Sequence, residues 1–283
     1  MTIAPIPIIP KHTQLQQHIS YYYFLKTDDD FETRYYAFPH INTVLNIHQH
    51  ASFDIKGLYT KVYGDATNPY DACVQGIREL PLLAHLTGKL NKVTIIFKPL
   101  GINHFIDHPF GDRYTLPSDS FDSWDSEPQY HNFLGKFYTA ESNDEKSEVL
   151  ENFLLAMLRP LPAYAQLHTA LQLLSNWDRN LSVDEICESI KLNARTFSRL
   201  FKKHLGVSPV TYRKVARFRH SLENKLFDSK LKRLTDIAYQ SNYYDQAYFN
   251  KMYRSLTGSN PQRFFNKVDS LADDMLIFEF MER

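Results

Sequence analysis

Two stretches in the last third of the chain place basic and amide side chains on one side of a helix. At helical spacing, the outward positions of the first stretch are Arg195, Ser198, Arg199, Lys202 and Lys203. Those of the second stretch are Gln246, Ala247, Asn250, Lys251 and Arg254. Such side chains neutralise polyanions and hydrogen-bond to the edges of bases. The chemistry predicted for these residues is therefore recognition of a polyanion and not catalysis.

The same two stretches belong to a repeat with a period of 52 residues. Phe197, Phe201, Gly206, Pro209 and Tyr212 recur as Phe249, Tyr253, Gly258, Pro261 and Phe264. The repeat keeps the apolar residues, the glycine that ends one helix and the proline that begins the next. Such a pattern indicates a repeated supersecondary unit and not only a similar composition. Two basic helices that follow equivalent turns suggest a protein that contacts DNA in two places.

Helix signals around the first copy predict a helix-turn-helix unit. Ser182 and Glu185 form a capping-box pattern that opens one helix, and Asn193 can cap the next, over 194–205, which Gly206 ends. The second copy is predicted as a helix over 235–239, a turn through 242–244 and a helix capped by Asp245. A helix over 209–227 joins the copies and spans about 28 Å. Successive major grooves on one face of B-DNA are about 34 Å apart, so one chain could reach two of them.

These motifs resemble the AraC/XylS family of bacterial transcription regulators over roughly 164–268. The pattern Phe197-x-Arg199-x-Phe201-Lys202, followed by Gly206-x-Ser208-Pro209-x-x-Tyr212, carries the resemblance. So do Ile237-Ala238, Phe249-x-Lys251-x-Tyr253-Arg254, Gly258 and Pro261-x-x-Phe264. Two departures stand out: Asn242 replaces the family's usual glycine, and Phe264-Phe265 replaces a closing Tyr-Arg. Asparagine tolerates left-handed backbone angles, so the turn is expected to survive.

The resemblance implies roles for the outward residues, with double-stranded DNA as the partner. The implied base contacts are Arg195, Ser198, Arg199, Gln246, Ala247, Asn250 and Lys251. The implied phosphate contacts are Lys202, Lys203 and Arg254. Such proteins commonly carry a sensing or dimerising domain, often a cupin-like barrel, so a small-molecule effector and a homodimer are expected, with RNA polymerase as a further candidate partner.

The N-terminal half reads as short strands, which together with the helical C-terminal part makes the fold class α+β. Val44–Ile47 and Val93–Phe97 are rich in β-branched residues and end at turn signals, which favours a barrel or a sandwich. The candidate effector pocket consists of Tyr21, Tyr23, Tyr36, Phe38, His40 and His48. These aromatic residues could equally be core. His48-x-His50 lacks the glutamate of a cupin metal site, so neither a metal nor another cofactor is predicted.

The charge distribution and the proline-containing linker divide the chain into four predicted parts. Residues 178–268 hold 18 Lys and Arg against 8 Asp and Glu, whereas residues 1–177 hold 13 against 19. We expect a sensing domain over 1–140, an amphipathic helix and proline linker over 141–162, a DNA-binding domain over 163–268 and a tail over 269–283. The helix at 145–158 could pack on the barrel or pair with a second chain. The tail, apolar in acidic surroundings, is predicted to pack on the N-terminal domain or on a partner.

The leading interpretation is an effector-responsive transcription regulator that is not an enzyme. The alternatives are a constitutive DNA-binding protein and, less favoured, a metallo-cupin enzyme fused to a DNA-binding module. Cys73 and Cys187 are isolated in the sequence, which is typical of reduced thiols in a cytoplasmic protein. No stretch reaches the roughly 18 apolar residues of a membrane span, and Met1–Pro10 does not resemble a signal peptide.

Overall fold

The chain divides into two compact units, each held by its own contacts. The computed structural model describes residues 6–162, 164–227, 237, 241, 243, 245–266, 269–271 and 276–280. Unit 1 comprises Met1–Arg34, Asn42–Gly76 and Ala84–Pro162, and unit 2 comprises Tyr35–Ile41, Ile77–Leu83 and Ala163–Arg283. Two short segments from the N-terminal half thus belong to the helical unit, which the division drawn from the sequence does not include. That four-part division stays a prediction.

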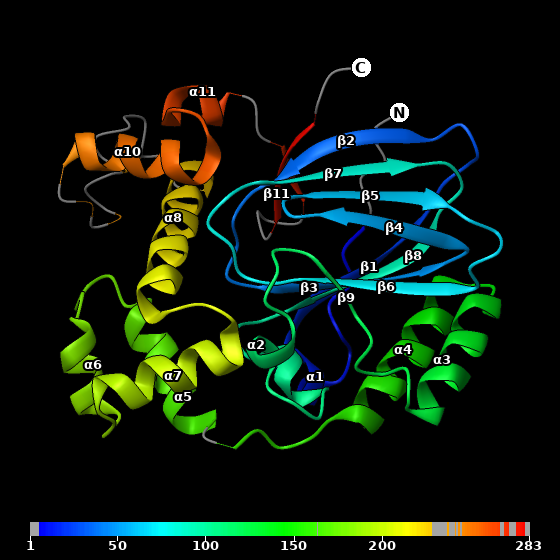
Figure 1. Cartoon of the computed structure of the whole chain (residues 1–283), viewed down its shortest axis with the longest axis horizontal. Coiled ribbons are helices and arrows are strands. Elements are labelled where there is room, and N and C mark those ends of the chain that lie inside the picture. The colour runs from blue at the N-terminus through cyan, green and yellow to red at the C-terminus, as the bar shows by residue number, and fades with distance from the viewer. Residues whose placement is uncertain are drawn as a thin grey trace. The chain divides into compact units, whose positions relative to one another are not determined.

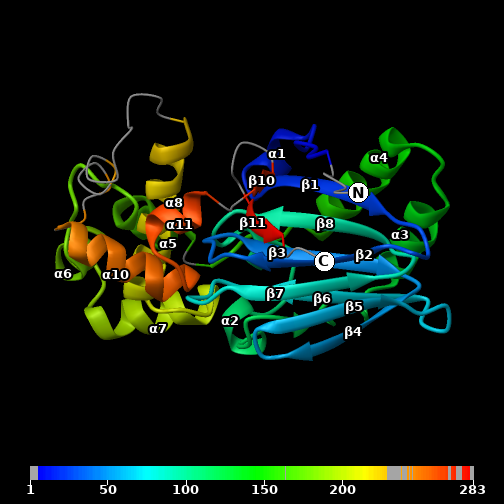
Figure 2. The same cartoon turned by 90° about the horizontal axis from the view of Figure 1, so that it is seen from above.

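The strands form two antiparallel sheets that can be followed in Figures 1 and 2. The first has the order β1 (Ile19–Lys26), β8 (Asn91–Phe97), β3 (Thr43–Gln49), β6 (Tyr70–Gln75) and β9 (Asp119–Ser120). The second has the order β10 (Asp269–Leu271), β11 (Leu276–Phe280), β2 (Glu32–Ala37), β7 (Leu82–Thr87), β5 (Tyr59–Gly64) and β4 (Ala51–Lys56). The predicted β-rich N-terminal half is confirmed. The strands that the structure describes make two sheets and not one closed barrel, because β1 and β4 end their sheets without pairing to each other.

Side-chain alternation gives the first sheet two chemically different faces. Leu45 and Ile47 of β3 and Ile95 of β8 lie on the face that packs against α3 (Pro128–Thr139) and α4 (Asn143–Met157). Leu154 of α4 is fully buried in this core. The helix predicted at 145–158 therefore packs on the sheet of its own chain, because its apolar stripe is covered there. The opposite face looks toward the second sheet, since the ring of His48 on β3 contacts that of Phe53 on β4 at 5.1 Å.

Short helical turns complete unit 1. They are α1 (Thr13–Gln16), η1 (Gly101–His104) and α2 (Phe110–Arg113). Glu151 on α4 ties the N-terminal segment to the core, because its carboxylate accepts hydrogen bonds from the Lys11 and His12 amides and from the Tyr22 hydroxyl. No helix among the described residues is both long and apolar enough to cross a membrane.

Unit 2 is built around one long helix. Its helices are α5 (Tyr164–Leu174), α6 (Val183–Ser189), α7 (Ala194–Leu205), α8 (Pro209–Phe227), α10 (Gln246–Thr257) and α11 (Pro261–Phe265). Figure 1 shows α7 and α10 near opposite ends of α8. The helices predicted over 194–205 and 209–227 are confirmed with the same bounds. The helix predicted over 235–239 and the turn over 242–244 lie mostly outside the described residues.

The C-terminal tail adds strands to the second sheet. β11 pairs antiparallel with β2, with Phe278 opposite Ala37 and Phe280 opposite Tyr35, and β10 pairs with β11. Close to this pairing, Phe264 of α11 contacts Phe38 edge-on at 4.7 Å. Packing of the tail on the N-terminal part of the chain was predicted, and the pairing with β2 agrees with it. Paired backbone covers a strand edge that would otherwise be open to another chain.

Candidate nucleic-acid interface

The two repeated helices begin in the same way. The Asn193 side chain accepts a hydrogen bond from the Thr196 amide at 2.8 Å, and the Asp245 side chain accepts one from the Tyr248 amide at 2.6 Å. Each bond satisfies an amide that a helix start leaves without a partner. The caps lie 52 positions apart, as do Ser208 and Asn260, which cap α8 and α11. The sequence repeat is therefore a repeat of local structure.

The repeated helices also end in the same way. Gly206 and Gly258 have φ angles of 76° and 74°, and their amides donate to the carbonyls of Lys202 and Arg254. A left-handed backbone conformation at this position favours glycine, because glycine has no Cβ atom. Both helices thus have the same length and project the same part of their surface.

Aromatic anchors fix how each helix is rotated about its axis. Phe197, Phe201, Phe249 and Tyr253 are fully buried. Phe201 contacts Tyr212 of α8 at 5.6 Å, and the equivalent pair, Tyr253 and Phe264, is 5.7 Å apart. Because the anchors occupy equivalent positions, the opposite faces of α7 and α10 carry the residues singled out in the sequence.

Those outward residues lie at the surface, with one exception. Exposed on α7 and α10 are Arg195, Ser198, Arg199, Lys202, Lys203, Gln246, Ala247, Lys251 and Arg254. Asn250 is half-buried. Within the described part of the chain, Arg199, Lys202 and Lys251 form no ion pair with a carboxylate. Their charges are consequently available to an external anion.

Arg217 of α8 connects the two helix-turn-helix units. Its guanidinium lies 5.4 Å from the ring centre of Trp177 and 5.9 Å from that of Tyr243, and it donates to the Asn180 side chain at 3.0 Å. Trp177 and Asn180 lie between α5 and α6, whereas Tyr243 lies three residues before the first residue of α10. A single arginine between two rings therefore restrains the orientation of the first helix-turn-helix unit relative to the second, within unit 2. This role of Arg217 is not visible in the sequence, because the two rings are remote from it in the chain.

Tyr248 is a surface residue that the sequence did not single out. It lies on α10 between Ala247 and Phe249 and is 42% exposed. In the sequence, a tyrosine next to a phenylalanine anchor is easily taken for a second buried anchor. For this reason the sequence does not indicate that Tyr248 is exposed. Its exposure beside Ala247 places it on the face that carries the predicted base contacts.

The candidate effector residues fall in two different units. Tyr21, Tyr23 and His48 are buried in unit 1, whereas Phe38 and His40 are buried and Tyr36 is half-buried in unit 2. No described contact joins the six into one pocket, so the proposed set remains a prediction. Considering only residues with described positions, no three His, Cys, Asp or Glu side chains could together hold a metal ion. Cys73 and Cys187 are buried free thiols.

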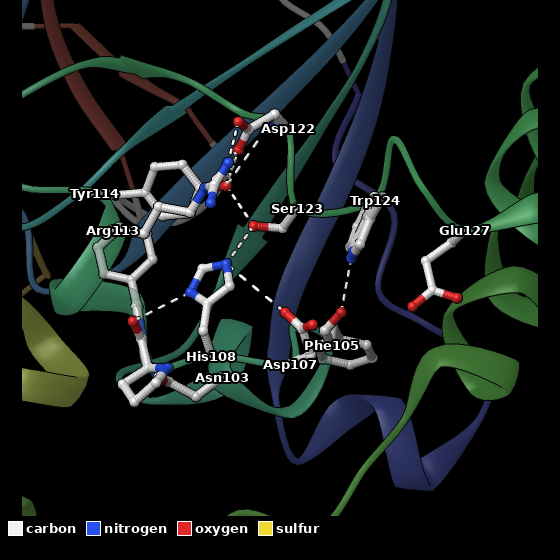
Figure 3. A network of polar contacts seen from close by, with 12 residues as sticks. Asn103, Phe105, Asp107, His108, Arg113, Tyr114, Asp122, Ser123, Trp124 and Glu127 are labelled. Carbon is white, nitrogen blue, oxygen red and sulfur yellow. Dashed lines mark hydrogen bonds and ion pairs between the residues drawn. The ribbon is translucent and has the colours of Figure 1, made fainter.

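A serine, a histidine and an aspartate meet in unit 1, but not in the arrangement of a nucleophilic triad. Figure 3 shows His108 beside Ser123 and Asp107. The same ring nitrogen, Nε2, lies 2.7 Å from the Ser123 hydroxyl and 3.9 Å from the Asp107 carboxylate, while Nδ1 faces the Pro109 carbonyl at 3.3 Å. A triad places the serine and the carboxylate on opposite ring nitrogens, so that the base is oriented from behind. This cluster holds the 105–124 region together and does not have that geometry.

A family model agrees with the helix-turn-helix geometry, and other known proteins show partial similarity to the chain. A family model described as a helix-turn-helix domain matches residues 186–267. The lactose operon transcription activator of Staphylococcus xylosus is 30% identical over 77 residues, which are 27% of this chain and 27% of that protein. A structure of ToxT from Vibrio cholerae covers 86% of this chain and 98% of its own at 13% identity, with a TM-score of 0.45. A structure of unsaturated fatty acid bound wild-type ToxT gives 15% identity and a TM-score of 0.43, covering 86% and 92%.

Residues 186–267 are accordingly a helix-turn-helix domain, in agreement with the resemblance to AraC/XylS regulators that the repeated motif carries. The aligned segment spans about a quarter of the curated relative, so what the whole chain does is a separate question.

Proposed function

We propose that the protein is a sequence-specific DNA-binding transcription regulator. One observation supports this above the others: two helices with equivalent caps, stops and anchors present exposed basic and amide side chains from the ends of one linking helix. Paired units of this kind suit two successive major-groove segments. The relative in Staphylococcus xylosus is named a transcription activator, which favours activation over repression.

In this proposal the outward residues divide into two roles. Arg195, Ser198, Arg199, Gln246, Ala247, Asn250 and Lys251 contact bases, since arginine pairs with guanine and the amides with adenine. Lys202, Lys203 and Arg254 contact phosphates, which position the protein without reading sequence. Tyr248 joins the first group, because its exposed ring can contact a thymine methyl group.

The remaining parts of the proposal concern unit 1 and the partners. Unit 1 binds a small-molecule effector, the regulator acts as a homodimer that contacts RNA polymerase, and it does so in the cytoplasm as a protein without enzymatic activity. The division into a sensing part over 1–140, a linker over 141–162, a DNA-binding part over 163–268 and a tail belongs to the same proposal. A chain with two reading helices already covers two groove segments, so a dimer would extend the site to four.

A footprint of the full-length protein on the DNA upstream of its own gene tests the proposal. We expect protection of two segments about 10 base pairs apart for each chain. Binding to that site should weaken steeply with salt, because each neutralised phosphate contributes a slope of about −0.9 in log affinity against log salt. Equal affinity for the upstream region and for random DNA at every salt concentration would overturn sequence-specific regulation.

A further inference from the structure

β4 ends the second sheet with an open edge in the part of the chain that the structure describes. It pairs with β5 on one side, and Figure 2 shows it at the margin of the sheet. At the edge of the first sheet, by contrast, Ile8 and Tyr22 exchange two backbone hydrogen bonds of 2.8 and 3.0 Å, so that a segment of the chain lies against β1. An open strand edge favours pairing with another strand. β4 is therefore a candidate surface for a partner chain.

The turn between β4 and β5 determines which backbone groups face this edge. Lys56 and Tyr59 pair on either side of a two-residue turn. Residues that flank such a turn are hydrogen-bonded to each other, and hydrogen-bonded pairs alternate with non-hydrogen-bonded pairs along an antiparallel ladder. Lys56 and every second residue before it consequently direct their backbone groups at β5. Phe53 and Ile55 direct their amides and carbonyls outward, away from β5.

A hydrogen bond at the start of β4 agrees with this direction. The carbonyl of Ala51, two residues before Phe53, accepts from the Asn68 side chain at 3.1 Å and not from β5. No described residue covers the backbone of Phe53 or Ile55 on this side in the same way. Both side chains are only half-buried, although they lie on the inter-sheet face, where the ring of Phe53 contacts that of His48. Backbone groups and apolar side chains at this edge thus lack cover together.

The outer face of β4 carries charges of both signs. Asp54 is opposite Lys61 of β5, and the Lys56 ammonium lies 3.0 Å from the Asp54 carboxylate. The side chains of Asp54 and Lys56 are 41% and 72% exposed, so both are accessible to a partner. Antiparallel pairing of β4 with a second copy of itself, centred on Ile55, would place each Asp54 opposite a Lys56. Moving the centre by one residue would instead place Asp54 opposite Asp54 or Lys56 opposite Lys56.

We propose that two copies of this chain pair through β4, antiparallel, about a twofold axis at Ile55. The Ile55 amide of each chain donates to the Ile55 carbonyl of the other, and the two isoleucine side chains cover each other. Asp54 and Lys56 form cross-strand ion pairs on the outer face, because a non-hydrogen-bonded pair brings its side chains close together. A twofold contact closes on itself and leaves no open edge at this place. The surface specifies the homodimer of the proposed function and rests on that part of it.

The size of the contact sets the expected strength of the dimer. A six-residue strand edge is small beside a standard interface of about 1,600 Å². We therefore expect a dissociation constant on the order of 10 µM in free solution. Two chains bound to neighbouring DNA segments are at a higher effective concentration, so the same contact stabilises their joint binding.

Sedimentation equilibrium of the full-length protein, from about 1 to 100 µM, tests this pairing. Asp54→Lys and Lys56→Asp each place like charges opposite one another in both cross-strand pairs. We expect either variant alone to dimerise about 30-fold more weakly than the wild type, the factor that about 1 kcal/mol in each of two cross-strand pairs gives. An equimolar mixture of the two variants should form a dimer as tight as that of the wild type, because the two lysines of one chain then face the two aspartates of the other.

The mixture distinguishes pairing between chains from an effect within one chain, since each variant keeps its own altered charges when the two are combined. Lys136→Asp, at an exposed position on α3, is the control for the change of charge and should dimerise like the wild type. A wild type that stays monomeric over the whole range would overturn the proposal. So would wild-type dimerisation of either single variant, or a mixture that dimerises as weakly as its components.

DNA binding by the same samples separates this surface from the proposed function. Both variants should bind a duplex that accommodates one chain as tightly as the wild type does, because β4 carries none of the predicted base contacts. If the wild type binds DNA specifically but its oligomeric state does not respond to the two substitutions, the β4 surface is wrong and the regulator remains. If the wild type does not bind DNA specifically, the regulator is wrong whatever its oligomeric state.

Discussion

The helical repeat and the β-sandwich place their polar residues in opposite environments. In α7 and α10 the basic and amide groups point to solvent, and the buried side is aromatic. In the sandwich, Glu151, Lys92 and His48 are buried, each on a different helix or strand. The surface groups therefore meet their partners only in a complex, whereas buried groups must find partners within the fold or in a small ligand.

Buried polar groups in the sandwich differ among themselves in how well they are satisfied. Glu151 accepts from two amides and one hydroxyl, which accounts for its burial. Lys92 contacts only one amide oxygen and one aromatic ring among the described residues, and these contacts do not account for the burial of its charge. A buried charge whose hydrogen bonds are all made is tolerated in the fold, whereas one without a counter-charge is costly to bury. The comparison separates buried polar groups whose loss should lower stability from those whose loss should not.

The largest effect should follow from Glu151→Ala. Its removal leaves the Lys11 and His12 amides and the Tyr22 hydroxyl without their acceptor, and we expect a loss of about 3 kcal/mol in the free energy of unfolding of unit 1. Urea unfolding followed by Trp124 fluorescence, in a Trp177→Phe background, reports on this unit, because Trp124 is buried against Phe153 of α4. DNA affinity should not change.

Glu148→Ala on the same helix provides the control, since Glu148 is exposed. It should shift the free energy of unfolding by less than about 0.5 kcal/mol. Similar losses in both variants would mean that helix propensity, and not the buried acceptor, determines stability here.

Acid should weaken the sandwich through a pair of neighbouring histidines. The rings of His18 and His104 are 3.9 Å apart. Burial and the neighbouring His104 and Lys98 lower the pKa of His18 to about 4, and burial also lowers the pKa of His104. Because the unfolded chain binds protons near pH 6.5 and the folded chain does not, stability is present above pH 6.5 and is lost as the pH falls toward 4. We expect His18 to contribute about 2 kcal/mol of loss between pH 7.5 and 5.

His18→Gln separates this contribution from the other titrating groups. Urea unfolding at pH 7.5 and 5 should show a smaller acid loss in this variant than in the wild type. His131→Gln, at an exposed position on α3, should keep the wild-type loss. An unchanged pH dependence in His18→Gln would show that the histidine pair does not govern acid stability.

Much of the helical unit could be predicted from the sequence because its signals are local. Ser182 and Glu185, Asn193 and Gly206 define helix ends within a few residues, and the structure has these caps where they were expected. The strands were predicted less completely: β3 and β8 contain the β-branched runs Val44–Ile47 and Val93–Phe97, while β2, β5, β6 and β7 carry no comparable signal. Their residues, such as the half-exposed Glu32–Ala37, carry little hydrophobic alternation.

The sites divide along the same line. The outward residues of α7 could be named because positions three and four apart share a helix face. The burial of Lys92 could not be predicted, because it depends on pairing with β3 and on cover from the second sheet, which no short window of sequence contains. For the same reason the contact of Arg217 with Trp177 and Tyr243, which are 40 and 26 positions away, became visible only in the fold.

The smallest expected effect on stability, and the sharpest on DNA, belongs to Arg199. Arg199→Ala should weaken binding to the upstream site by about 1–3 kcal/mol and relax the preference at one base pair, because it removes a base contact. Lys202→Ala should weaken binding to all sequences alike and reduce the salt slope by about 1. Neither substitution should change the free energy of unfolding by more than about 0.5 kcal/mol, since both side chains are exposed. Binding measured by fluorescence anisotropy on specific and random duplexes at several salt concentrations distinguishes the two. Equal losses on both duplexes for Arg199→Ala would move this residue from the base contacts to the phosphate contacts.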